Sequence, residues 1–256
     1  MTDAPLEIRR ERDGRLLRLR LDRPKANVID AEMIAALDAA FAGVAENPDI
    51  LAVLLDHAGA HFSFGASVEA HLPGRCAAML QSLHALIKRM LACPVPILVA
   101  VRGQCLGGGL EVAMSGSLIF VAPDARLGQP EIKLAVFAPA ASCLLPRLVA
   151  RGHAEDLLYS GRAMTGARAA EIGLALAAAP DPEAAALAYF DDNLSGLSAS
   201  SLRLAVEAAR GRFRDEVAAD LDRVEALYLE RLMNTRDAVE GLEAFIEKRT
   251  AKWEHR

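Results

Sequence analysis

The residues best suited to chemistry lie in one part of the chain. Three glycines at 107–109 stand directly before Leu110 and Glu111, and a second carboxylate, Glu131, follows after an apolar stretch. A glycine run lets a ligand approach a backbone N–H closely, and this run opens onto the start of an expected helix. The region therefore offers a donor for a carbonyl oxygen and two carboxylates that could share one water. That combination suits the addition of water to a carbon–carbon double bond conjugated to a carbonyl.

Two backbone N–H groups are candidates for holding the carbonyl oxygen. The N–H of Gly108 would stand at a helix N-terminus, where negative charge on an oxygen is stabilised. A second donor is expected from Ala66, because Gly65 permits a turn after the strand expected at 50–55. A pattern like the one around Gly65 is more often an ordinary loop, so the second donor depends on where the fold places it.

The two glutamates have a structural interpretation when each is taken alone, because a helix dipole favours a glutamate in its first turn. Both Glu111 and Glu131 stand in mainly apolar stretches, however, and a carboxylate near burial needs a reason. A raised pKa in an apolar cleft would let one carboxyl hold a proton while the other accepts one. Which glutamate is the acid and which the base stays open.

Several other kinds of protein are disfavoured. The four cysteines include no C-x-x-C pair, and the six histidines show no metal-ligand spacing, so no metal site is expected and no histidine is favoured for function. The net charge of −5 gives no reason to expect nucleic acid as a partner. Residues 1–12 are charged, unlike a signal peptide, and the apolar runs are too short to span a membrane. We expect a cytoplasmic protein with reduced thiols.

The pattern of elements predicts an α/β fold with parallel strands. A hairpin with its turn at Asp13-Gly14 opens the chain, and Asp30 is suited to cap a helix over 31–45. Composition shifts near residue 193, which divides the chain into a core at 1–193 and a helical region at 194–256. The further elements expected are strands at 8–10, 16–21, 50–55, 97–101 and 118–122, and a helix at 77–91.

At this point the residues resemble a known family, the enoyl-CoA hydratase/isomerase (crotonase) superfamily, over nearly the full chain. The resemblance implies a spiral of ββα units, a C-terminal helical trimerisation region, and homotrimers or hexamers. It implies an acyl-CoA thioester as substrate and no separate cofactor, since coenzyme A is part of that substrate. The motifs that carry the resemblance occur in the family's order at 21–27, 62–66, 103–111, 127–132 and, in the tail, 244–249.

The resemblance also assigns roles to residues of this sequence. It places the oxyanion hole at the N–H groups of Ala66 and Gly108, and the paired acid/base glutamates of family hydratases at Glu111 and Glu131. The residues expected to contact coenzyme A are Lys25 and Ala26, together with Phe245 and Lys248, which in the family can reach coenzyme A on a neighbouring subunit.

Two departures from the family pattern concern the acyl pocket. Ser67 stands where the family usually has Asp, and a loop at 137–143 replaces the usual glycine-rich one, so Ser67, Ala138 and Pro139 are expected to shape the pocket. The stretches at 63–69 and 137–146 resemble a narrower group, hydratases that act on cyclohexa-1,5-diene-1-carbonyl-CoA in anaerobic benzoyl-CoA degradation. Their reaction is a 1,4-addition, with water joining the β-carbon and the proton going to the far end of the diene.

Two alternatives remain open from the sequence. One is a straight-chain 2-enoyl-CoA hydratase or a double-bond isomerase of the same superfamily. The other is a protein of a different class, which binds coenzyme A or RNA on this fold without catalysis. The acidic balance and the retention of both glutamates argue against the second alternative.

Overall fold

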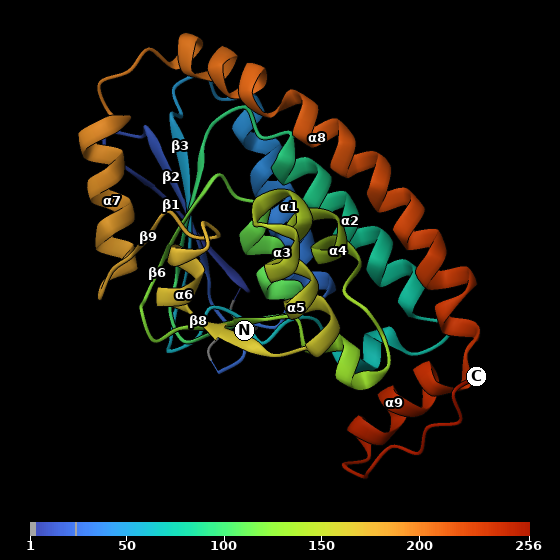
Figure 1. Cartoon of the computed structure of the whole chain (residues 1–256). Helices are drawn as coiled ribbons and strands as arrows, with labels where there is room; N and C mark the ends of the chain where they lie inside the picture. Colours follow the sequence, from blue (N-terminus) through green and yellow to red (C-terminus); the bar gives the residue numbers. More distant parts are fainter. Residues whose placement is uncertain (1–3, 24) are drawn as a thin grey trace.

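A six-stranded sheet forms the centre of the computed structural model, which describes residues 4–23 and 25–256 (Figure 1). Its first two strands form an antiparallel hairpin, and the remaining neighbours pair in parallel. The strands are, in spatial order, β1 (Leu6–Glu11), β2 (Leu16–Leu21), β3 (Ala52–His57), β4 (Ile97–Val101), β6 (Leu118–Val121) and β9 (Ala177–Ala178). A smaller sheet joins β5 (Gln104–Leu106), β7 (Arg126–Gly128) and β8 (Ala163–Thr165).

Helices cover both faces of the large sheet. In Figure 1, α7 lies on one side of the strands, whereas α1 and α2 lie on the other with α8 outside them. The helices are α1 (Ala31–Ala45), α2 (Cys76–Leu91), α3 (Gly108–Met114), α4 (Pro139–Leu148), α5 (Arg151–Ser160), α6 (Gly166–Glu171), α7 (Pro182–Asn193), α8 (Ala199–Glu230) and α9 (Arg236–Ile246), with short 3-10 turns η1 (Val68–His71), η2 (Pro130–Leu134) and η3 (Leu232–Asn234).

Most expected elements are confirmed, and the small shifts have local causes. The helix over 31–45 begins as expected, because the Asp30 carboxylate accepts a hydrogen bond from the Met33 N–H at 2.9 Å. The strand expected at 50–55 instead runs from Ala52 to His57, since its parallel partner β2 starts opposite Ala52 and ends opposite His57. Pro24, expected in the segment that ends the second strand, and residues 1–3 of the charged N-terminus lie outside the described residues.

The prediction of a loop at 137–143 is wrong. Only Phe137 and Ala138 precede α4, and from Pro139 onward the chain is helical. Proline suits the first position of a helix, because its N–H would have no partner there and its φ is already helical. The segment therefore presents a helix N-terminus, rather than a loop, to the interior.

The long helix α8 packs on the core of its own chain. Val217, Leu221 and Val224 are buried in the same apolar cluster as the sheet and α2. Within the described residues, no helix combines the length and apolar character that crossing a membrane requires.

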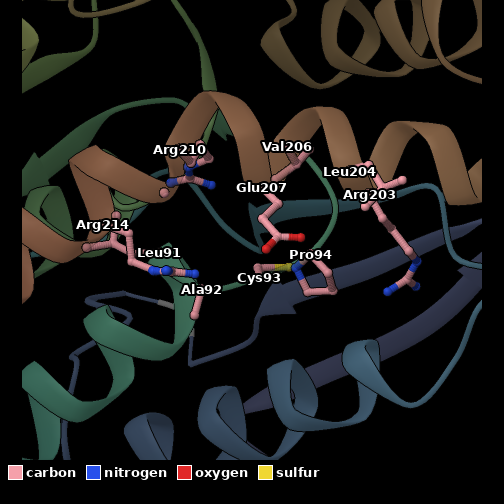
Figure 2. Close-up of a pocket in the computed structure, with 11 residues that line it drawn as sticks. Leu91, Ala92, Cys93, Pro94, Arg203, Leu204, Val206, Glu207, Arg210 and Arg214 are labelled. Atoms are coloured by element: carbon pink, nitrogen blue, oxygen red, sulfur yellow. The ribbon is translucent and has the colours of Figure 1, made fainter.

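Two arginines tie α8 to carbonyl groups at the ends of core elements. Arg203 donates to the carbonyl of Asn47 at 2.6 Å, after α1, and Arg210 donates to the carbonyl of Ser115 at 3.0 Å, after α3. Figure 2 shows Arg203 and Arg210 on α8 with the segment around Pro94 opposite them. These bonds satisfy carbonyls that the helix ends leave unpaired.

Replacing Arg210 with Leu is expected to lower the free energy of unfolding by about 1–3 kcal/mol, because buried carbonyls at the end of α3 lose their donor. Urea unfolding followed by circular dichroism measures the change. Arg212→Leu, an exposed arginine on the same helix, is the matched control and should leave stability unchanged. Equal stability of the two variants would show that Arg210 does not anchor α8.

Candidate active site

Two backbone segments meet at the N-terminus of α3. A Cβ on Gly65 would lie 3.4 Å from the Gly108 nitrogen, and a Cβ on Gly108 would lie 3.3 Å from the Ala66 nitrogen. The N–H groups of Ala66 and Gly108 are therefore close neighbours. Among the residues that the structure describes, neither group donates a hydrogen bond, so both are available to an oxygen atom of a ligand.

Polar side chains hold the Ala66 loop in this position. The Ser63 hydroxyl accepts a hydrogen bond from the Gly65 N–H at 3.0 Å and donates to the Asn27 carbonyl at 2.7 Å. The Asn27 side chain in turn donates to the carbonyls of Ala58 and His61 at 3.1 and 3.0 Å. Ser63 and Asn27 are both buried, so the loop carrying Ala66 is fixed from behind by a network that excludes water.

Glu111 is buried in the first turn of α3, as expected, and only 3% of its surface is exposed. Its Oε1 atom accepts a hydrogen bond from the Ala141 N–H at 2.8 Å, at the N-terminus of α4. Burial raises the pKa of Glu111, and the N–H groups of Ala141 and Ala140 partly offset this rise by stabilising the ionised form. The carboxylate is thus held in a fixed position and is able to carry a proton near neutral pH.

Glu131, in η2, lies directly over a glycine. A Cβ on Gly107 would come within 2.5 Å of the Glu131 Oε1 atom, so only glycine leaves room for this carboxylate. With its amide nitrogen turned toward Glu131, the buried Gln129 side chain donates to the two carboxylate oxygens at 3.2 and 3.1 Å. Turned the other way, the amide oxygen accepts a hydrogen bond from the protonated acid, so Gln129 serves both protonation states.

The two carboxyl groups share one cavity. Glu111, Glu131, Ala66 and Gly108 all line a cavity of about 940 Å³. Burial raises the pKa of Glu131, and the charge of Glu111 raises it further. Because two like charges in one cavity disfavour each other, the pair retains a proton at pH values where an ordinary glutamate has none.

The structure brings some of the other expected residues to this cavity and leaves others outside it. Phe245 and Lys248, at the end of α9, line the cavity of their own chain, although the family resemblance implied contact with coenzyme A on a neighbouring subunit. Pro139 of the expected acyl-pocket residues also lines it. Within the described residues, the wall does not include Lys25, Ala26, Ser67 or Ala138.

Three groups at this site were not expected to have a role. Gln129 lies between Gly128 and Pro130, in the motif that contains Glu131, but no role was expected for it from the sequence. The Ala141 N–H was missed because a helix was not expected there, although Pro139 was a signal for a helix start. His71 lines the cavity on η1, and no histidine was favoured for function from the sequence.

The side chains of the described residues offer no site for a metal ion. Within residues 4–23 and 25–256, no group of three or more histidine, cysteine, aspartate or glutamate side chains is placed to hold a metal ion.

The chain is similar over nearly its whole length to proteins of one known family. The model of the enoyl-CoA hydratase/isomerase family matches residues 11–256. Cyclohexa-1,5-dienecarbonyl-CoA hydratase of Thauera aromatica is 62% identical over 253 residues, covering 99% of this chain and 98% of that protein. A protein of Mycobacterium bovis named probable enoyl-CoA hydratase echA8 is 34% identical, with 96% and 97% covered. The crystal structure of an enoyl-CoA hydratase/isomerase from Pseudoalteromonas atlantica has a TM-score of 0.85 at 26% identity, with 97% and 99% covered.

Replacing Glu111 with Gln is expected to lower the pKa of Glu131, because a neighbouring negative charge is removed, while burial keeps that pKa above the ordinary glutamate value. Carboxyl carbon NMR over a pH titration of glutamate-labelled protein measures it. Glu171→Gln, on the exposed face of α6, is the control and should leave the titration of Glu131 unaltered. An unchanged Glu131 pKa in E111Q would mean that the two carboxyls do not interact.

Proposed function

The chain belongs to the enoyl-CoA hydratase/isomerase family, and on that basis we propose that it adds water to cyclohexa-1,5-diene-1-carbonyl-CoA. The family and fold expected from the sequence motifs are confirmed by the family model and by the related crystal structure. The proposed activity is that of a hydro-lyase, which forms and breaks a carbon–oxygen bond without a redox change.

One observation carries this proposal. Two carboxyl groups with raised pKa values share a cavity with two backbone N–H groups that donate no hydrogen bond among the described residues. Hydration of a conjugated thioester needs a group that takes a proton from water, a group that gives one to carbon, and donors that stabilise the enolate oxygen. The cavity contains all three.

The first step is the attack of water. The thioester oxygen accepts hydrogen bonds from Ala66 and Gly108, which draws electrons from the conjugated system. Water lies between Glu111 and Glu131, and an ionised carboxylate takes its proton as the water oxygen bonds to the β-carbon. The electrons of the attacked double bond move to the thioester oxygen, which gives a dienolate held by the two N–H groups.

The second step returns a proton to carbon. A protonated carboxyl of the same pair gives its proton to the far end of the diene. The thioester carbonyl re-forms, and one ring double bond remains, between the α-carbon and the β-carbon that water did not attack. One water molecule has then been added as hydroxide and a proton, and the pair has regained as many protons as it gave.

Two findings favour a cyclic substrate: the name of the Thauera aromatica relative, and the position of Pro139 at the cavity wall. The Thauera aromatica protein, at 62% identity over almost both chains, is named for the cyclic dienoyl substrate. Pro139 opens α4 at the cavity wall and fixes the helix whose Ala141 N–H holds Glu111. The segment that departs from the usual family pattern is thus connected directly to a carboxyl that handles the proton.

Coenzyme A and the subunit arrangement complete the proposal. Lys133 and Lys248 line the cavity together with the exposed Phe245, and we assign the phosphates and adenine of coenzyme A to this side. Lys25 and Ala26 remain proposed contacts, since the Ala26 carbonyl binds the N–H of Phe64, which does line the cavity. We further propose a cytoplasmic homotrimer or hexamer without a separate cofactor.

The purified protein is expected to hydrate the cyclic dienoyl-CoA and, in deuterium oxide, to place deuterium at the far end of the former diene rather than on the α-carbon. Product analysis by proton NMR and mass spectrometry distinguishes the two positions. Crotonyl-CoA serves as the straight-chain comparison. Rapid hydration of crotonyl-CoA with no reaction of the ring would instead favour a straight-chain enoyl-CoA hydratase.

Glu131→Gln is expected to lower kcat by about 10²–10⁴-fold, because the amide side chain can neither take a proton from water nor give one to carbon. Affinity for a saturated acyl-CoA and the thermal unfolding midpoint should remain close to those of the unaltered protein. Glu171→Gln again provides the matched control. Turnover of E131Q near the normal rate would remove Glu131 from the mechanism.

A further inference from the structure

The cavity contains a histidine that the proposed mechanism does not use. His71 is the last residue of η1, the 3-10 turn that directly follows Ala66 and Ser67. Its side chain lines the same cavity as the two glutamates. The imidazole is half-buried, and this burial lowers the pKa of His71, so the ring is neutral at physiological pH.

The hydrogen bond of His71 fixes its tautomer. The Nδ1 atom lies 2.9 Å from the Ser67 carbonyl oxygen, which can only accept, so Nδ1 carries the hydrogen. In a neutral ring the other nitrogen, Nε2, is then a hydrogen-bond acceptor. Within the described residues Nε2 has no hydrogen-bond partner, which leaves water to satisfy it.

His71 stands beside an apolar part of the cavity wall. Its neighbours Val68 and Leu72 pack against a cluster containing Leu80, Val136 and Leu242, all three almost fully buried. Those three residues line the cavity as well. Behind them, in the same cluster, Tyr228 packs against Phe137, with ring centroids 5.2 Å apart. With coenzyme A assigned to the side of Lys133, Phe245 and Lys248, this apolar part of the wall is the place left for the acyl group.

We propose that His71 determines acyl specificity, because its free Nε2 disfavours long alkyl chains that would cover it and so favours a compact ring. The inference rests on the proposed function, in which the acyl group is a six-membered ring. An alkyl chain that displaces water from Nε2 offers no donor in return, and a buried acceptor without a partner weakens binding. A ring held near the glutamates leaves that water in place. His71 thereby weakens the binding of long-chain acyl groups and does not strengthen the binding of the ring.

Binding of saturated acyl-CoA thioesters tests this without requiring turnover. Isothermal titration calorimetry with butyryl-CoA and octanoyl-CoA gives the ratio of the two dissociation constants for each variant. His71→Leu should strengthen octanoyl-CoA binding relative to butyryl-CoA by on the order of 10-fold, since the unpaired acceptor is gone. His71→Gln, which keeps an acceptor of similar reach, should retain the original ratio.

The controls separate polarity from size and from misfolding. His153→Leu, on α5 and away from the cavity wall, should leave the ratio unaltered. If H71L does not fold by circular dichroism, His71→Met gives the same readout. An unchanged ratio in the folded apolar variant, or an equal rise in H71Q, overturns the role of His71. Because these ligands do not react, that result is independent of whether the protein hydrates the cyclic diene.

Discussion

The contact between two backbone segments at Gly65 and Gly108 is the constraint on which the active site depends. A Cβ on Gly65 would come within 2.9 Å of the Leu106 carbonyl oxygen, and a Cβ on Gly108 would make a tight contact of 3.3 Å with the Ala66 nitrogen. Side chains at these positions would therefore disturb the approach that brings the Ala66 and Gly108 N–H groups together. The approach also positions α3, and with it Glu111. The parallel sheet supplies the frame, because β3 and β4 end at the same edge and deliver both segments there.

Burial of the carboxyl pair is the second consequence of this arrangement. Burial alone would neutralise Glu111, yet the N-terminus of α4 offers N–H donors that stabilise its charge. The Gln129 amide binds the Glu131 carboxyl group, and the absence of a side chain at Gly107 leaves room for it. The opposing effects leave the pair able to gain and lose a proton near neutrality, which is what an acid and a base acting on one water require.

The wall of the cavity adds selectivity to this chemistry. Its apolar part is built from residues distant in sequence, since η1, α2, α8 and α9 all contribute to the apolar cluster around Leu80 and Tyr228. His71 brings a hydrogen-bond acceptor to the cavity wall beside that cluster. A polar group at this place costs little while water reaches it and more when a ligand removes the water, so it discriminates among acyl groups by their reach.

Local patterns in the sequence were sufficient for the strands of the hairpin, for the helix capped by Asp30 and for the place of Glu111 in the first turn of a helix, since these depend on neighbouring residues and on the period of apolar side chains. The motifs that carry the family resemblance were also sufficient for the family. The start of α4 at Pro139, its N–H bond to Glu111 and the place of His71 in the cavity were decided by tertiary structure. Each joins segments far apart along the chain, and a pattern of neighbours carries no information about which distant groups burial will bring into contact.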